Sequence, residues 1–112
     1  MEKEKDKQSK VIEKMNDLVK SIISFNSSLE DDPNSSLRYF LNEVAKSMPD
    51  YVESMIKSKN KLNKRKSLLE TKTSLDEAKV YLSLIEGFGY GNTKELSNKV
   101  DEFNKLLSKN FS

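Results

Sequence analysis

The only three glycines of this 112-residue chain lie within residues 87–91, between two stretches in which apolar residues recur at helical spacing. Glycine has no Cβ, so it readily adopts the left-handed backbone conformation that closes many helices. The cluster therefore predicts a corner at which one helix ends and the next begins, with Phe88 or Tyr90 packed against the end of the fold. A phosphate-binding loop is a weaker interpretation, because such loops follow a strand and no strand pattern precedes Gly87.

Four stretches of the chain place apolar residues three and four positions apart, which is the spacing of an amphipathic helix. They predict helices at residues 9–26, 36–58, 62–86 and 93–110, after a frayed N-terminus at residues 1–8. The apolar stripes run through Val11, Met15, Leu18, Ile22 and Phe25, then Leu37, Leu41, Val44, Met48, Tyr51 or Val52, and Met55, then Leu68, Thr71, Leu75, Ala78, Leu82 and Ile85, and last Leu96, Val100, Phe103 and Leu107. Short connections between four comparable helices favour an all-α fold, an antiparallel up-down-up-down four-helix bundle in one domain.

Three local signals refine the helix boundaries. Pro49 removes an internal hydrogen bond from the second helix, so we expect one bent helix there. Residues 57–66 hold a single apolar residue, Leu62, so the turn between the second and third helices falls in this segment, most simply at residues 60–63. Residues 92–95, with the sequence Asn-Thr-Lys-Glu, have the form of a capping box that starts the fourth helix.

Apolar residues make up 35% of the chain and charged residues 34%, a balance that is typical of thin helical bundles with solvated outer faces. The longest apolar runs are only a few residues, far short of the roughly 20 that span a bilayer. Residues 1–10 alternate Lys with acidic residues and do not lead into an apolar signal segment. The sequence predicts a cytoplasmic protein with no membrane partner.

The apolar faces of the first and third helices are wider than a single seam. Val19, Ile23, Leu69 and Leu84 widen them. A chain of this length has only a modest core, and contacts between subunits would use the additional apolar surface. We therefore expect a homo-oligomer.

The chain contains no cysteine and no histidine, so it lacks thiolate chemistry and the most common general base and transition-metal ligand. The carboxylate pairs at residues 76–77 and 101–102 are adjacent in sequence, which directs the two side chains to different sides of a helix. A di-metal site in a helical bundle usually draws on Glu-x-x-His pairs, which this chain cannot supply. The sequence predicts a protein that is not an enzyme and that has no metal or cofactor.

Residues 57–66 carry six cations and no acid, although the net charge of the chain is only +2. Clustered cations repel one another, which destabilises the fold unless an anionic partner or solvent offsets the repulsion. Clustered charge is also sufficient to bind the phosphates of RNA or DNA. The candidate nucleic-acid-binding residues are Lys57, Lys59, Lys61, Lys64, Arg65 and Lys66.

Two geometries are open for this segment. In one continuous helix, Lys57, Lys61, Lys64 and Arg65 share a face; at a turn, the side chains fan outward instead. An inert solvated turn is an equally weighted interpretation of the same residues. No aromatic RNA-recognition signature accompanies the cations, so sequence-specific readout is not expected.

From Pro33 onward the layout resembles a bacterial family of four-helix bundles. This family includes proteins encoded in intervening sequences of 23S ribosomal RNA genes and the accessory variability proteins of diversity-generating retroelements. The resemblance covers about two-thirds of the chain and rests on Pro33, on Ser-Met-Pro at residues 47–49, on the region of residues 74–75, and on residues 84–90, which look like the family's helix-ending Leu-Gly-Tyr corner. Residues 100–107 are similar to its closing helix.

The resemblance implies a homopentameric, barrel-like assembly. For the retroelement branch it also implies binding to nucleic acid and to a reverse transcriptase, with residues 57–66 as the contact. Our leading hypothesis is a non-enzymatic accessory protein that holds nucleic acid. The alternative is a protein-only oligomeric scaffold, or an intervening-sequence-type bundle, without nucleic-acid binding; salt-dependent affinity for nucleic acid separates the two.

Overall fold

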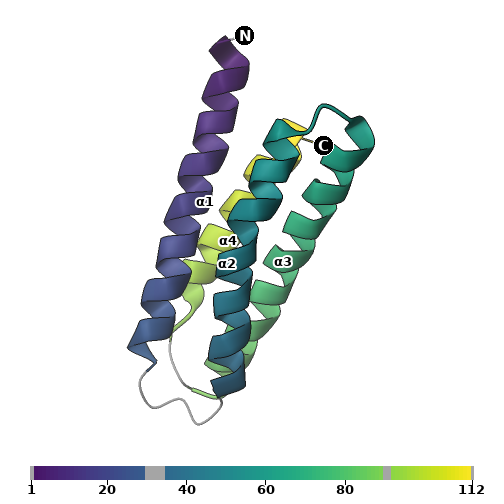
Figure 1. Ribbon diagram of the computed structural model, residues 1–112. Helices are drawn as coiled ribbons and strands as arrows, with labels where there is room; N and C mark the ends of the chain where they lie inside the picture. Colours follow the sequence, from purple (N-terminus) through teal and green to yellow (C-terminus); the bar gives the residue numbers. More distant parts are fainter. Residues whose placement is uncertain (1, 30–34, 90–91, 112) are drawn as a thin grey trace.

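The computed structural model describes residues 2–29, 35–89 and 92–111. Four helices account for almost all of them (Figure 1): α1 (Glu2–Ser28), α2 (Ser35–Lys57), α3 (Lys61–Gly87) and α4 (Lys94–Phe111). No strand occurs in the described residues, so the predicted all-α fold of four helices is confirmed. None of these helices has an apolar stretch long enough to cross a membrane.

The four helices enclose one elongated core. Both α1 and α3 pack against α2 and α4, and the body measures 48 × 22 × 18 Å. The predicted stripes supply the core, since their residues are buried throughout except for Phe25, Tyr51 and Leu68, which are half-buried. Of the four widening residues, Ile23, Leu69 and Leu84 are exposed, whereas Val19 is half-buried against the core.

Segments far apart in sequence meet at each end of the bundle. The N-terminal part of α1, the turn between α2 and α3, and the C-terminal end of α4 lie at one end (Figure 1). The C-terminus of α1, the start of α2 and the corner between α3 and α4 lie at the other, which we call the corner end. Charged residues that are distant in the sequence therefore become neighbours at each end of the bundle.

The first helix starts earlier than the sequence predicts. It begins at Glu2, whereas the apolar stripe predicts a start at residue 9 and a frayed segment before it. Lys, Glu and Gln have high helix propensity, and extending an existing helix fixes only one further residue per hydrogen bond. Residues 1–28 contain no Gly or Pro, so no helix-breaking residue interrupts this extension of α1.

The turn between α2 and α3 occupies residues 58–60, slightly before the predicted 60–63. Asn60 is the N-cap of α3: its side-chain oxygen accepts hydrogen bonds from the backbone N–H groups of Leu62 at 2.8 Å and Asn63 at 3.4 Å. Satisfying these otherwise unpaired donors fixes the helix start at Lys61. Pro49 lies inside α2, which continues through it as one helix.

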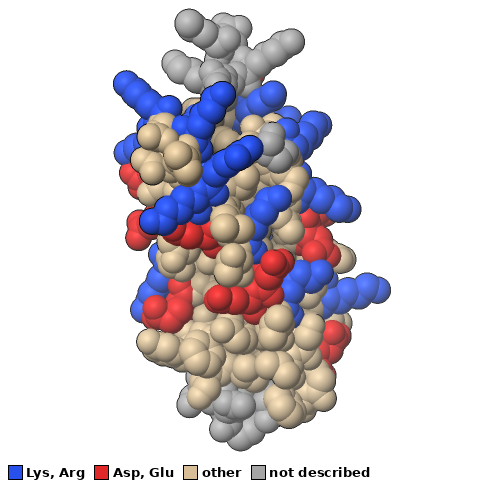
Figure 2. Space-filling view, turned by 90° about the vertical axis from the view of Figure 1, so that its right-hand side faces the viewer, with Lys and Arg blue, Asp and Glu red and all other residues tan. Residues whose placement is uncertain are grey.

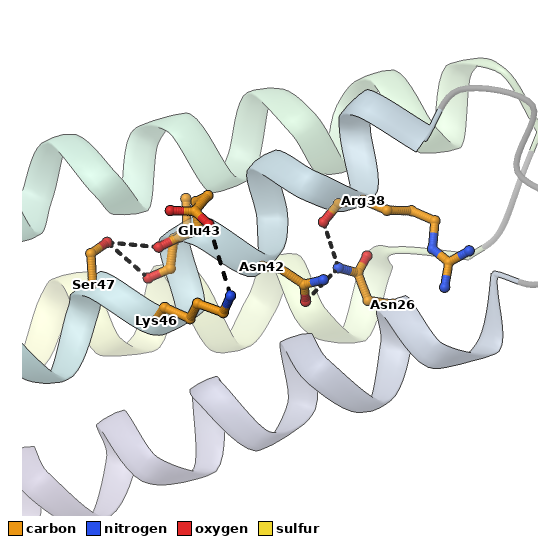
Figure 3. A network of polar contacts seen from close by, with 7 residues as sticks. Asn26, Arg38, Asn42, Glu43, Lys46 and Ser47 are labelled. Atoms are coloured by element: carbon orange, nitrogen blue, oxygen red, sulfur yellow. Dashed lines mark hydrogen bonds and ion pairs between the residues drawn. The ribbon is translucent and has the colours of Figure 1, made fainter.

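A buried amide joins α1 to α2 near the corner end (Figure 3). Asn26 donates from Nδ2 to the Arg38 carbonyl at 2.8 Å and to Asn42 Oδ1 at 2.9 Å. Further along α2, Ser47 donates to the Glu43 carbonyl at 2.8 Å. Because the N–H groups of a buried amide need acceptors, the two bonds from Asn26 Nδ2 favour one register of α1 against α2.

The glycine cluster forms the predicted corner. Residue Gly87 ends α3, the Gly89 N–H donates to the Glu86 carbonyl at 3.0 Å, and Gly89 has a φ of 76°. Phe88 is 56% exposed, while Tyr90 lies outside the described residues. At the predicted capping box, Asn92 Oδ1 accepts a hydrogen bond from the Lys94 N–H at 3.0 Å. The buried Thr93 donates its hydroxyl to Glu86 across the corner at 3.2 Å.

Candidate nucleic-acid interface

The six predicted cations divide between two helices and the turn that joins them. Lys57 ends α2, Lys59 lies in the turn, and the remaining four occupy the first two turns of α3. All are exposed except Lys64, which is half-buried. The single helical face that would group Lys57 with Lys61 is therefore not formed, because the turn at residues 58–60 interrupts the helix. The cations are instead gathered at one end of the bundle (Figure 1).

The start of α3 is an electrostatically unfavourable place for this charge. A helix N-terminus carries a partial positive charge from its unpaired N–H groups, and acidic residues in the first turn usually compensate for it. The first turn of α3 has no acid, and Lys61 and Lys64 occupy it instead. An anion bound at this point would relieve the repulsion among the side chains and between the side chains and the helix terminus.

One of the six cations is already paired. The Lys57 ammonium lies 2.6 Å from Glu53 Oε1, one turn earlier on α2. The hydrogen bond from Lys57, supported by its charge, lowers the pKa of the exposed Glu53 carboxyl. The other five cations form no ion pair with any residue that the structure describes. Their charge is available to an external anion.

A shallow hollow opens between the end of α2 and the start of α3. It has a volume of about 480 Å³ and is lined by Ser54, Lys57, Ser58, Asn63, Lys66, Ser67 and Glu70. Two cations from different helices, together with hydroxyl and amide donors, provide the groups that hold a phosphate. Glu70 is part of the same lining, and its negative charge opposes an anion at that side of the hollow.

Five further lysines lie at the same end, although they are distant from residues 57–66 in sequence. Exposed Lys7, Lys10 and Lys14 come from α1, and exposed Lys105 and Lys109 from α4. We call this end of the bundle, with residues 57–66 at its centre, the basic end. The face in Figure 2 shows the resulting gradient: Lys and Arg gather toward one end, and acids lie nearer the middle.

Sequence position alone does not group these lysines with residues 57–66, because they come together only where the start of one helix lies beside the end of the next. Their charge is partly balanced, because α1 also carries Asp6 and Glu13 and α4 carries Glu102 in the same region. Residues 57–66 therefore remain the strongest concentration of positive charge.

The corner end has a different surface. On the face shown in Figure 2, its described side chains carry no charge. Exposed Tyr39 and Phe40 from α2, and Leu84 and Phe88 from α3, lie toward this end. Phe40 also stacks on Tyr81, with ring centroids 5.3 Å apart. Among the described residues, the exposed aromatic rings thus lie away from the concentrated positive charge.

Neither a metal-binding group nor a related protein assigns another role to this surface. Across residues 2–29, 35–89 and 92–111, no three His, Cys, Asp or Glu side chains form a group that could hold a metal ion. No protein-family model, curated protein or solved structure matches the chain. The resemblance to the intervening-sequence and accessory variability proteins stays a prediction.

Proposed function

We propose that this protein is a non-enzymatic accessory protein that binds the phosphate backbone of RNA or DNA with its basic end. The observation that carries the proposal is the charge at the start of α3, where four cations stand on a helix N-terminus with no acid in its first turn. Such an arrangement destabilises the free protein, and bound phosphates would offset that cost.

Backbone recognition without base reading fits this surface best. Lysine and arginine side chains bind phosphates in any sequence, whereas reading single-stranded bases generally needs aromatic rings beside the charges. Exposed Tyr39, Phe40 and Phe88 lie toward the corner end and do not supply such a platform. We expect affinity to depend on the number of phosphates contacted and little on the base sequence.

Several finer features belong to the same proposal. The short turn at residues 58–60 and the pairs of helices in contact support the antiparallel up-down-up-down topology. The absence of cysteine is consistent with a cytoplasmic location. The reverse transcriptase partner and the pentamer are predictions from the resemblance alone, and a mass measurement tests the second.

A salt titration tests the proposal. Fluorescence anisotropy would follow the wild-type protein binding to labelled single-stranded and duplex RNA and DNA. If about five phosphates are neutralised on a duplex, a fourfold rise in salt lowers the affinity by about 10²–10³-fold. Absence of binding at low salt would contradict the proposal and favour the protein-only scaffold, for which the exposed aromatic residues of the corner end are the supporting observation.

A further inference from the structure

The third helix has apolar residues on two opposite faces, and only one of these faces belongs to the core. The outward face carries Leu62, Leu69 and Val80, which are 77%, 66% and 56% exposed. Together with exposed Thr73 they follow steps of seven and four residues, the spacing of a coiled-coil seam. We call this row, completed by Lys66 and Asp76 at the intermediate steps, the outer seam of α3.

Charges along the outer seam change sign from one end to the other. Arg65 and Lys66 lie in its N-terminal half, and Asp76 and Glu77 in its C-terminal half. All four are exposed, and none forms an ion pair with another described residue. The seam therefore presents apolar residues flanked by one basic and one acidic half.

The outer seam is self-complementary: when its sequence is read in the opposite direction from Thr71, apolar positions meet apolar positions or Thr73, and cations meet acids. Leu62 and Val80 are equally far from Thr71 in sequence, as are Leu69 and Thr73. The same reversal relates Arg65 to Glu77 and Lys66 to Asp76. Two α3 helices in antiparallel contact at this register would place each cation opposite an acid and each apolar residue opposite an apolar residue or Thr73. A parallel pair would instead oppose like charges.

We propose that a second copy of this chain docks on the outer seam, forming an antiparallel two-fold dimer centred at the level of Thr71. Such a contact is isologous, so every complementary pair occurs twice and the assembly closes at two copies. The pentamer that the resemblance implies needs a different, heterologous contact. The two assemblies are distinguished by mass.

The contact area between the two α3 helices sets the expected affinity of the dimer. Residues 61–81 span roughly 30 Å of helix, and a helix with its side chains is roughly 10 Å across. A contact along this one helix therefore covers roughly 300 Å² per partner, well below the roughly 800 Å² of a standard stable interface. We expect a weak, transient dimer.

The dimer leaves much of the basic end free. Lys61 and Lys64 lie about 100° and 160° around α3 from Leu62, outside the seam, and Lys57 and Lys59 precede the helix. Of the six cations in residues 57–66, only Arg65 and Lys66 lie on the side of α3 that faces the partner. The two-fold arrangement sets the two basic ends at opposite ends of the dimer, where each can still meet phosphates. The inference does not depend on nucleic-acid binding.

Sedimentation velocity across a concentration series tests the dimer. Wild type should pass from monomer to dimer, whereas Arg65→Glu/Lys66→Glu and Asp76→Lys/Glu77→Lys should each weaken self-association by at least about tenfold, since each opposes like charges. An equimolar mixture of the two variants should form a one-to-one dimer, because every charge pair in the seam is then favourable. The variant Leu69→Asn removes apolar contact without changing charge and should also weaken the dimer.

Matched controls separate this contact from general charge attraction. Lys20→Glu/Lys94→Glu has the same net charge as Arg65→Glu/Lys66→Glu but alters only positions outside the seam, so it should dimerise like wild type. Far-UV circular dichroism checks that each variant is folded. Because Asp76→Lys/Glu77→Lys retains all six cations of residues 57–66, it should also retain nucleic-acid binding, so the two proposals fail independently.

A disulfide test fixes the register, because the chain has no native cysteine. A mixture of Leu62→Cys and Val80→Cys should crosslink under mild oxidation, whereas Leu62→Cys alone should not, since its two thiols would be about 27 Å apart along the seam. The inference is overturned by a monomer at every concentration, by an assembly larger than two copies, by dimers that persist in both charge-reversal variants, or by equal crosslinking of Leu62→Cys alone.

Discussion

The two ends of the bundle share one core but differ in how their helices begin. At the corner end, α4 starts with Lys94 followed by an acid, Glu95, in its first turn. At the basic end, α3 starts with Lys61 and has no acid in its first turn. An acid near a helix N-terminus stabilises it and a cation destabilises it. The start of α3 departs from this rule for stability. At the corner end α4 follows it, whereas α2, which also begins there, has no acid in its first turn.

From the contrast between the starts of α3 and α4 we infer that the basic end is organised for something other than the stability of the fold. Positive charge at the basic end comes from three separate segments, and among its described cations only Lys57 forms an ion pair with a described acid. Departures of this kind are expected at functional sites. The cap at Asn60 and the core beneath the basic end compensate for them.

Cavities in the shared core should have the largest effect on stability. Leu41 lies toward the corner end and Met55 toward the basic end, and both are fully buried in one cluster. We expect Leu41→Ala and Met55→Ala each to lower the free energy of unfolding by about 2–5 kcal/mol. Urea denaturation followed by circular dichroism measures both, with exposed Leu62→Ala as the control. A loss below about 0.5 kcal/mol at only one end would show that the ends do not share a core.

The cap of α3 gives the next largest effect. Asn60 accepts two backbone hydrogen bonds, so Asn60→Ala should lower stability by about 0.5–2 kcal/mol. In contrast, Asn60→Asp keeps an acceptor and adds a negative charge beside the helix N-terminus, and should raise stability by about 0.3–1 kcal/mol. Thermal and urea unfolding measure both changes. Equal losses in the two variants would contradict an electrostatic penalty at this helix start.

Charge reversal at the two helix starts should change stability in opposite directions. At the basic end, Lys61→Glu should raise the free energy of unfolding by about 0.3–1 kcal/mol, and at the corner end Glu95→Lys should lower it by a similar amount. Repeating the urea titrations at high salt should shrink both effects, since exposed charges are screened. A destabilising Lys61→Glu at low salt would remove the contrast between the two ends.

The smallest effect concerns the ion pair between Lys57 and Glu53. Because Lys57 lowers the pKa of Glu53 in the folded protein, this pair stabilises the fold above the unfolded pKa of Glu53. The contribution disappears as the pH falls through the lower folded pKa. In Lys57→Met, the Glu53 pKa should return toward its ordinary value. Carboxyl NMR titration measures it, and an unchanged pKa would show that Lys57 is not the cause.

Much of the fold follows from sequence spacing alone. Burial of a stripe of apolar residues is a strong constraint, and residues such as Leu18, Met48 and Leu82 are buried as predicted. Helix starts are set by weaker, local effects. The early start of α1 depends on the propensity of charged residues, and the start of α3 depends on the side chain of Asn60. Neither effect is visible in an apolar pattern.

The candidate site was predictable only in part. Residues 57–66 are contiguous, so their charge is evident in the sequence. Lys7 and Lys109 reach the same end only because α1 and α4 are packed beside α2 and α3, which is a tertiary relationship. The shallow hollow shared by Lys57 and Lys66 likewise requires the turn at residues 58–60, which divides the segment between two helices.

The central claim is that position, and not merely total charge, determines nucleic-acid binding. Anisotropy at one low salt concentration would compare wild type with two variants of equal net charge. One carries Lys61→Ala, Lys64→Ala, Arg65→Ala and Lys66→Ala at the basic end. The other carries Lys20→Ala, Arg38→Ala, Lys46→Ala and Lys94→Ala elsewhere on the bundle.

We expect the basic-end variant to remain folded and to bind duplex and single-stranded nucleic acid at least about tenfold more weakly than wild type, while the control variant stays within about threefold. Equal losses in the two variants would mean that net charge alone attracts the nucleic acid. Unchanged binding in the basic-end variant would contradict the account directly.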